Sequence, residues 1–246
     1  MDAGCAALSR PRVPRAADVR AELARAAHPG RAKGLARFFK TGPGEYAEGD
    51  VFLGIRVPDQ RAIARRFRDL PPREIERLLR SRLHEERQTA LFILVDRYAK
   101  GDPKTRTECV RLFVDNLDHV NNWDLVDSSA HQLLGDHLLT RDRRRLVRLA
   151  RSRVLWERRV AMVATFAFIL AGDAKPTFEV ARLLLSDEHD LIHKAAGWML
   201  REVGKRVSAD ALRAFLEEHA TEMPRTALRY AIERFSATER RAWLAR

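Results

Sequence analysis

The sequence predicts an all-α protein, a right-handed α-solenoid in which pairs of helices stack on one another. Two observations support this fold class. Glycine (12 residues) and proline (10 residues) are sparse and clustered, and no stretch sustains the alternation of apolar and polar residues that strands require. The chain also repeats itself at intervals of 31 to 36 residues, the length of one helix pair in such solenoids.

Helical segments are expected between breaks rich in glycine and proline. Several of the prolines occupy positions where a helix would start, because the first turn leaves its N–H groups without helical partners. The breaks fall at residues 42–44, Pro58, Pro71 and Pro72, residues 101–103, Gly172 and Asp173, Gly204, and Pro224.

The internal repeat sets the order of the helix pairs. Residues 78–90 align without gaps on residues 149–161, a shift of 71 positions, and a further 35 and 31 positions carry Ala161 onto Ala196 and Ala227. Because 71 is about twice 35, another unit is expected midway, in the helical segment 121–139. A single helix pair cannot bury its own apolar face, so neighbours must stack, and their second helices then line a concave surface. These features are typical of HEAT-like repeats, although an irregular bundle with one duplicated hairpin would also give the 71-residue match.

The chain is expected to form one HEAT-like-repeat domain over residues 16–246. Residues 1–15 contain Pro11 and Pro14 and lack the apolar core of a secretion signal, so we expect a flexible N-terminal arm there. The longest apolar run, residues 160–172, is too short to span a bilayer and indicates a buried helix.

Charge favours a polyanionic partner. Lys and Arg number 46 against 34 Asp and Glu, a formal net charge of +12, which favours nucleic acid or an anionic membrane surface and disfavours a protein scaffold. Arginine accounts for 39 of the 46, a bias that genome composition can also produce. Cys5 and Cys109 lack metal-ligand spacing, so we expect a cytoplasmic protein without disulfides or a metal.

The repeat frame places one side chain per unit at the same position on the inner helices. With Arg159 as reference, the counterparts are polar or basic and could follow a phosphate backbone, although for any single arginine a solvated helix face is the plainer interpretation. The counterparts are Gln88, Trp123 or Asp124, Lys194 and Arg225.

Two tryptophans on this face suggest chemistry. Trp123 and Asp127 are four residues apart, as are Lys194 and Trp198, so each pair shares a helix face. Tryptophan on a helix is commonly a core residue. Indole faces attract cations, however, and a carboxylate stabilises positive charge that develops in a site poor in water. Hydrolysis of an N-glycosidic bond passes through such a sugar cation. A purine alkylated at a ring nitrogen leaves as a neutral base, so a lone aspartate suffices where ordinary glycoside hydrolysis needs two carboxylates.

Four ordered motifs resemble the AlkD-like DNA alkylation repair proteins, which are HEAT-like-repeat DNA glycosylases. The resemblance spans residues 31–235 and implies excision of positively charged N3- and N7-alkylated purines from double-stranded DNA by a monomeric, monofunctional glycosylase that uses no metal or organic cofactor. The motifs are VFLGIRVP (51–58), NWDLVD (122–127), WERRVA (156–161) and HKAAGWMLRE (193–202).

The resemblance also implies roles for individual residues. Asp127 would be the catalytic carboxylate, Trp123 and Trp198 would pack against the lesion nucleotide, and Arg159 would hold a phosphate. Contacts with DNA are likewise expected from Arg158, Lys194, Gln88 and Phe38. Phe38 stands where the family has a DNA-contacting tyrosine, and Asn122 stands where an additional aromatic residue can occur, so both positions depart from the pattern.

Alternatives remain open. His189 and His193 have the i, i+4 spacing of a metal pair but no third ligand, and the basic run 141–145 could contact phosphate or form a solvated turn. A non-catalytic HEAT-repeat module that binds distorted or branched DNA is the alternative to a glycosylase.

Overall fold

The structure, a computed structural model, describes residues 12–246, and every regular element in that part of the chain is a helix. An isolated parallel bridge pairs Val51 with Leu83. Of the predicted N-terminal arm, residues 1–11 lie outside the described residues. Arg15 precedes the first helix and donates its backbone N–H to Asp18 at 2.8 Å.

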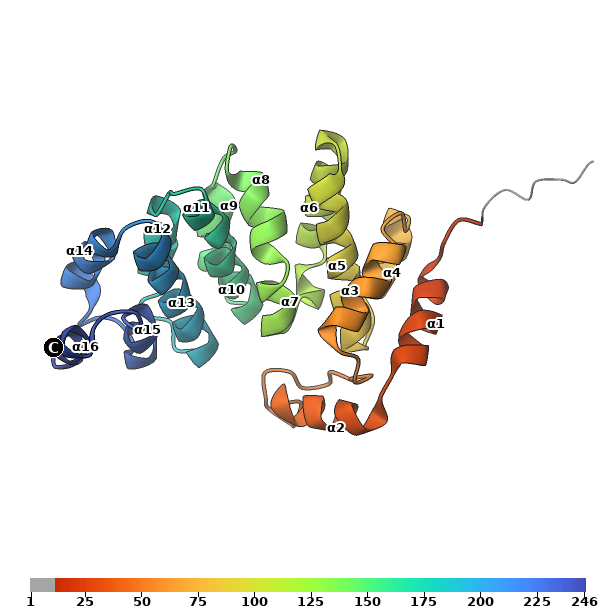
Figure 1. The fold of residues 1–246 in the computed structure, drawn as a ribbon, viewed down its shortest axis with the longest axis horizontal. Coiled ribbons are helices and arrows are strands. Elements are labelled where there is room, and N and C mark those ends of the chain that lie inside the picture. Colours follow the sequence, from red (N-terminus) through yellow and green to blue (C-terminus); the bar gives the residue numbers. More distant parts are fainter. Residues whose placement is uncertain (1–11) are drawn as a thin grey trace, which may run out of the picture.

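The helices follow the breaks expected from glycine and proline (Figure 1), except that Gly204 lies inside α13 and the predicted break there is wrong. A Cβ at Gly204 would stand 2.6 Å from Leu212 Cδ2, so this glycine allows close packing rather than ending the helix. Pro29, Pro58, Pro72, Pro103 and Pro176 each stand in the first turn of a helix, as predicted. The elements are α1 (Ala16–Ala26), α2 (Pro29–Phe38), α3 (Val57–Arg66), α4 (Pro72–Leu79), α5 (His84–Lys100), α6 (Pro103–Asp115), η1 (Leu117–His119), α7 (Trp123–Asp127), η2 (His131–Gly135), α8 (Asp136–Leu138), α9 (Arg144–Ala150), α10 (Leu155–Ala164), α11 (Phe166–Leu170), α12 (Lys175–Leu183), α13 (Asp190–Arg206), α14 (Ala209–His219), α15 (Arg225–Ala231) and α16 (Ala237–Leu244).

The predicted repeat is confirmed as a series of stacked helix pairs. The shift of 71 residues carries the start of α5 at His84 onto the start of α10 at Leu155, and a further 35 residues reach the start of α13 at Asp190. The additional unit expected within residues 121–139 is present as α7, η2 and α8. Figure 1 shows these pairs following one another along a curved array.

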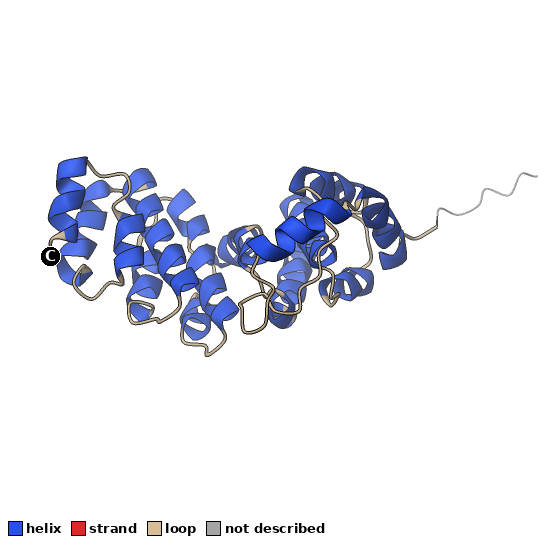
Figure 2. Cartoon of the chain, turned by 90° about the horizontal axis from the view of Figure 1, so that it is seen from below, coloured by secondary structure: helices blue, strands red, loops and turns tan. Residues whose placement is uncertain are grey.

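Helix α2 breaks the regular stacking. In Figure 1 it lies crosswise below the lower ends of α3, α4 and α5, and Figure 2 shows the same crossing from below. Phe39, just after α2, stacks on Trp123 of α7 with ring centroids 5.1 Å apart. The chain thus brings an early segment against the middle of the array.

One hydrophobic core runs through the array, from Val19 in α1 to Trp243 in α16. The apolar run 160–172 contributes buried residues to it from α10 and α11, as its composition predicted. A small separate cluster of Phe39, Ala47 and Phe52 packs the α2 segment against the rest. Among the described residues, no helix is both long and apolar enough to cross a membrane.

Two glycines set the closest helix crossings. A Cβ at Gly135 would stand 2.2 Å from the backbone oxygen of Ala164, and one at Gly197 would stand 2.4 Å from that of Ala227. Backbone atoms cannot move aside cheaply, so these positions accept only glycine at the observed spacing. Gly197 precedes Trp198, and its contact with α15 therefore sets where that indole lies.

Candidate functional site

A cleft of about 560 Å³ gathers most of the side chains singled out in the sequence. Its walls come from the segment after α2, from the start of α7, from α10, and from α13 and α15. Of the predicted site residues, Phe38, Trp123, Arg159, Lys194 and Trp198 line it. The repeat frame accounts for this convergence, because equivalent positions of successive inner helices lie on one face.

Asp127 lies beside the cleft, paired with Arg159. The guanidinium donates from Nε to one carboxylate oxygen at 2.9 Å and from Nη2 to the other at 2.8 Å, and its Nη1 donates to the backbone oxygen of Leu191. Arg159 is only 5% exposed, whereas Asp127 keeps 21% of its side chain exposed. Such bidentate pairing fixes the carboxylate in position and leaves two guanidinium N–H groups of Arg159 for another acceptor.

Opposing effects act on the pKa of Asp127. Burial raises it, since desolvation penalises the charged carboxylate, and the charge and hydrogen bonds of Arg159 lower it. The charge of Asp124 adds to the rise, so the pKa of Asp127 lies above its ordinary value. The carboxylate is therefore less hydrated and more basic than one at the surface, a state suited to stabilising a nearby cation.

Trp123 is held by aromatic neighbours on the α2 side. Its indole stacks on Phe39, and its Nε1 donates to the hydroxyl of Tyr46 at 3.2 Å. The backbone N–H of Trp123 donates to the Oδ1 of Asn122 at 2.8 Å, and Asn122 thereby caps the start of α7. Phe38, 64% exposed, meets the indole edge-on with ring centroids 6.0 Å apart. A rigid aromatic wall thus forms one side of the cleft.

The opposite side belongs to α13. Trp198 lies near Phe166 with ring centroids 6.3 Å apart, and Lys194, one helical turn earlier, bonds Asp190 at 2.7 Å. Lys194 keeps 41% of its side chain exposed, and the hydrogen bond to Asp190 raises its pKa. A positive group and the indole of Trp198 therefore line the same cleft, where a phosphate could be held.

Comparison with known proteins identifies the family. The sequence profile described as DNA alkylation repair enzyme matches residues 19–235. The chain belongs to this family. Among solved structures it is similar to a "Predicted DNA alkylation repair enzyme from Enterococcus faecalis", with a TM-score of 0.66 at 17% identity over 86% of this chain and 97% of that one, a likeness of fold. No curated protein matches.

Two predicted DNA-contacting residues of this alkylation repair family member lie outside the cleft. Arg158 directly precedes Arg159 in α10 but lines a separate hollow with Asp187 and His189. Its Nε pairs with Asp187 at 2.6 Å. Gln88 is 3% exposed and donates to Asp124 at 2.8 Å. Their contacts with DNA stay predictions, because each side chain is engaged by a neighbouring element.

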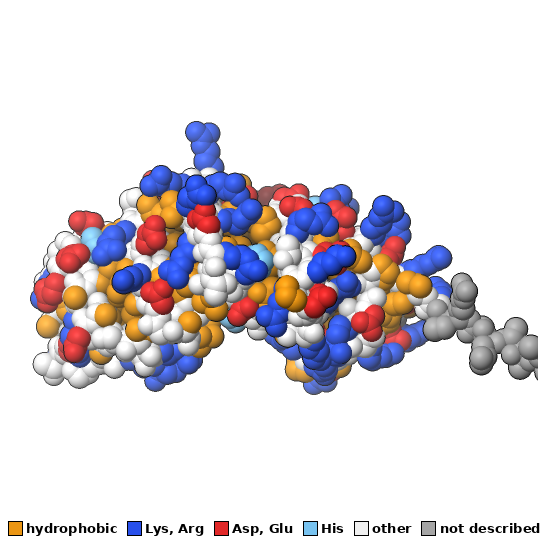
Figure 3. Space-filling model, turned by 90° about the horizontal axis from the view of Figure 1, so that it is seen from above, with side chains coloured by type: hydrophobic (Ala, Val, Ile, Leu, Met, Phe, Trp, Pro, Cys, Tyr) orange, Lys and Arg blue, Asp and Glu red, His pale blue; other side chains and the backbone are white. Residues whose placement is uncertain are grey.

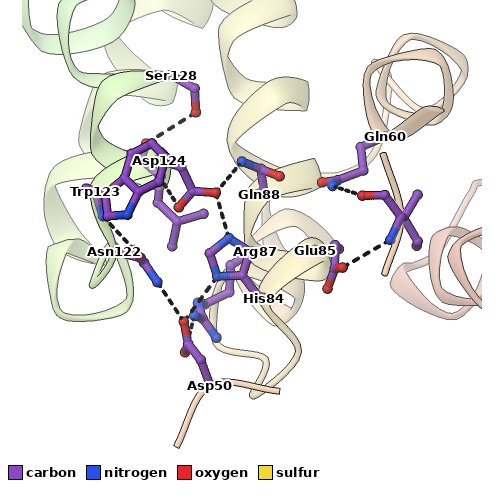
Figure 4. A network of polar contacts seen from close by, with 12 residues as sticks. Asp50, Gln60, His84, Glu85, Arg87, Gln88, Asn122, Trp123, Asp124 and Ser128 are labelled. Atoms are coloured by element: carbon purple, nitrogen blue, oxygen red, sulfur yellow. Dashed lines mark hydrogen bonds and ion pairs between the residues drawn. The ribbon is translucent and has the colours of Figure 1, made fainter. Parts of the chain in front are cut away.

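A buried polar network between the loop after α2, α5 and α7 was not anticipated from the sequence (Figure 4). His84 at the start of α5 contacts Asp50 at 3.1 Å through Nδ1 and Asp124 at 2.8 Å through Nε2. Arg87 and Asn122 complete the shell around Asp50. The network joins the loop after α2 to α5 and α7, and so ties the wall containing Trp123 to the solenoid.

The two carboxylates decide the charge of His84. Burial alone would lower its pKa, but Asp124 and Asp50 raise it to about 9, so the ring carries a proton on each nitrogen at neutral pH.

One signal in the sequence could have revealed this site. The 71-residue alignment sets His84 and Glu85 against Leu155 and Trp156, and polar residues replace apolar ones at buried positions.

Glu85 holds the loop that precedes α3. Its carboxylate accepts the backbone N–H groups of Leu53, Gly54 and Ile55 at 2.7–3.2 Å. Gly54 has a φ of 82°, and a Cβ there would stand 2.3 Å from the backbone oxygen of His28. The loop therefore packs directly on the start of α2 and positions the aromatic wall.

The histidine pair offers no evident metal centre. His189 accepts the backbone N–H of Leu191, and the Nε2 of His193 contacts the backbone oxygen of Asp187. Within residues 12–246 no group of three His, Cys, Asp or Glu side chains could hold a metal ion.

Proposed function

We propose that the protein is a monofunctional DNA N-glycosylase that hydrolyses the N-glycosidic bond of positively charged N3- and N7-alkylated purines in duplex DNA. One observation carries the proposal. The carboxylate of Asp127, positioned by Arg159, stands beside a cleft that presents the indoles of Trp123 and Trp198. The protein would act as a cytoplasmic monomer without a metal or organic cofactor.

The chemistry follows from charge. Loss of an alkylated purine breaks the N-glycosidic bond and leaves a sugar cation, to which water then adds at C1′ with loss of a proton. A carboxylate of raised pKa in a partly dry site stabilises that cation more than water does. Aromatic faces favour the cationic nucleotide over an ordinary one. The leaving base is neutral, so no second carboxylate is needed as an acid. Lys194 and the two uncommitted N–H groups of Arg159 would hold backbone phosphates at the cleft.

Replacement of the carboxylate tests the proposal. We expect Asp127→Asn to bind duplex DNA as the wild type does and to release N7-methylguanine about 10² times more slowly, the usual cost of removing one strong electrostatic group. Single-turnover release of free base from a duplex with one N7-methylguanine measures this against the spontaneous rate. Asp118→Asn, at a side chain 73% exposed, is the matched control. Release that is unchanged in Asp127→Asn would remove Asp127 from the mechanism.

The pairing of Asp127 with Arg159 also supports the second candidate, a module that binds distorted DNA without catalysis. Both carboxylate oxygens are engaged by the guanidinium, as in a purely structural ion pair. The same experiment separates the two functions. A wild-type protein that binds the duplex but releases no base above the spontaneous rate would be such a module.

A further inference from the structure

The backbone of Lys40, just after α2, has an unusual conformation. Its φ is 54°, in the left-handed region that side chains disfavour because the Cβ crowds a neighbouring carbonyl oxygen. Within residues 12–246 the other residues with a positive φ are all glycines, namely Gly44, Gly49, Gly54 and Gly172. Among the described residues, Lys40 is therefore the position where a side chain is kept in this conformation at a cost in free energy.

The turn that contains Lys40 is one that glycine commonly completes. The backbone N–H of Thr41 donates to the oxygen of Ala36 at 3.2 Å, and that of Lys40 donates to the oxygen of Arg37 at 3.3 Å. Many helices end in this pattern, with glycine at the left-handed position. The same turn ends α11, and there the left-handed residue is Gly172. The turn itself therefore does not require a lysine at position 40.

The side chain of Lys40 supplies a positive charge to the candidate cleft. It is exposed and lines the cleft together with three arginine and lysine side chains, Arg159, Lys194 and Arg201. Each of those three pairs with a carboxylate, whereas Lys40 pairs with no carboxylate among residues 12–246. An anion that enters the cleft can therefore meet the ammonium group of Lys40 without displacing a partner.

Contacts on both sides of Lys40 fix its place beside the aromatic wall. Phe39, the preceding residue, stacks on Trp123, and the backbone oxygen of Lys40 accepts the N–H of Ala47 at 3.2 Å. Tyr46, the neighbour of Ala47, accepts the indole N–H of Trp123 at 3.2 Å. The left-handed turn is therefore tied to the indole of Trp123 from both of its ends.

We propose that Lys40 binds a phosphate of the DNA backbone in the cleft, and that its left-handed conformation is retained because this turn places the side chain there. The inference rests on the proposed binding of duplex DNA but not on base release. Residues held in sparsely populated backbone conformations cluster at binding sites, where function offsets the loss of stability. The fold thus gives up stability at position 40 in exchange for affinity.

Substitutions at position 40 separate the backbone strain from the charge. Lys40→Gly removes both, Lys40→Gln removes the charge and keeps a side chain in the left-handed turn, and Lys40→Arg keeps both. Lys104→Gln is the matched control, because Lys104 is an exposed lysine at the start of α6 that does not line the cleft. Thermal unfolding gives the melting temperatures, and titrations of an unmodified duplex between about 50 and 200 mM salt give the affinities.

Stability and affinity should change in opposite directions in Lys40→Gly. Its melting temperature should rise by about 2 °C, because glycine adopts the left-handed conformation without strain, while Lys40→Gln should melt as the wild type does. Both variants should bind the duplex more weakly and reduce the slope of log affinity against log salt by about 1, the value for one phosphate contact. Lys40→Arg and Lys104→Gln should keep the wild-type slope.

Two results at position 40 would overturn the inference. One is a wild-type slope in Lys40→Gly, because the lysine would then contact no phosphate. The other is a lower melting temperature in Lys40→Gly, because the side chain would then stabilise the fold itself.

The same measurements distinguish this inference from the proposed function. A wild-type protein that fails to bind the duplex would overturn both. Absence of base release together with the expected slopes would overturn the glycosylase and leave the inference standing. A rise in melting temperature with inorganic phosphate that depends on Lys40, with no change of slope on the duplex, would show a site for free anions and refute a DNA phosphate.

Discussion

At Asp127 a single carboxyl group experiences both burial and an ion pair, and the balance between them sets its charge. Burial raises its pKa and Arg159 lowers it. Arg159 therefore controls the protonation of Asp127 in addition to any phosphate that it holds. The family resemblance implied only a phosphate contact for Arg159. The bidentate pair that Arg159 forms with Asp127 joins residues 32 positions apart, and the sequence does not display it.

Removal of the guanidinium should shift the pH dependence of base release. In Arg159→Gln the pKa of Asp127 should rise further, because the opposing charge is lost while burial remains. The acid limb of the pH–rate profile should then move to higher pH. Single-turnover rates across pH measure this, and a limb at the wild-type position would mean that Arg159 does not govern the ionisation of Asp127.

The charge of the His84 side chain leads to a second prediction about a single residue. Its folded pKa of about 9 exceeds the ordinary 6.5, so the stability it supplies is complete below about pH 6.5 and is lost as pH rises through about 9. The difference corresponds to a contribution on the order of 3 kcal/mol. Denaturant unfolding from pH 6 to 10 should show a steeper loss of stability for the wild type than for His84→Gln, and parallel profiles would contradict the charged state.

Among the elements, α13 contributes most to the cleft. It supplies Lys194 and Trp198, and it packs on α15 where Gly197 allows the two backbones to approach. A π-helical turn, η2, begins at His131, four residues after Asp127 at the end of α7. Local irregularities of this kind occur frequently near functional sites because they re-aim side chains.

Substitution of Gly197 should therefore disturb both stability and site. A Cβ there would also stand 2.5 Å from the Cβ of Tyr230, so Gly197→Ala should destabilise the protein by about 1–3 kcal/mol and displace Trp198. Gly34→Ala in α2 is the control, because nothing lies within 4 Å of a Cβ at that position and alanine favours helix. Equal melting temperatures for the two variants would show that α13 and α15 adjust freely.

For the whole molecule, the net charge of +12 is spread widely. Figure 3 shows Lys and Arg side chains along the entire face seen from above, far more than a single cleft needs. Such a charge attracts DNA from a distance and makes binding sensitive to salt, but it does not by itself select a site. Under the proposed function, specific phosphate contacts would come from the few basic groups that line the cleft.

The salt dependence of binding distinguishes these groups. Lys194→Gln should weaken duplex binding and reduce the slope of log affinity against log salt by about 1, the value for one phosphate contact. Arg144→Gln, at a side chain 91% exposed in the basic run 141–145, should leave the slope unchanged. Titrations between about 50 and 200 mM salt provide the comparison, and equal slopes for Lys194→Gln and the wild type would remove Lys194 from the interface.

The sequence by itself determined the helical repeat and the side chains that share its inner face. Helical periodicity acts over a few residues and the repeat recurs at a nearly constant interval, so Trp123, Arg159, Lys194 and Trp198 could be placed on one side from the order of the residues alone. Glycine and proline marked most helix boundaries for the same local reasons, although Gly204 lies inside α13.

Only the tertiary structure decided which of these side chains pair with one another. The contacts of Asp127 with Arg159, and of His84 with Asp50 and Asp124, join positions 32 to 40 residues apart. No periodic pattern encodes them, because they depend on how α2 folds under the array and on how closely adjacent helices pack. For that reason Gln88 and Arg158, both predicted to contact DNA, turned out to be engaged by neighbouring carboxylates.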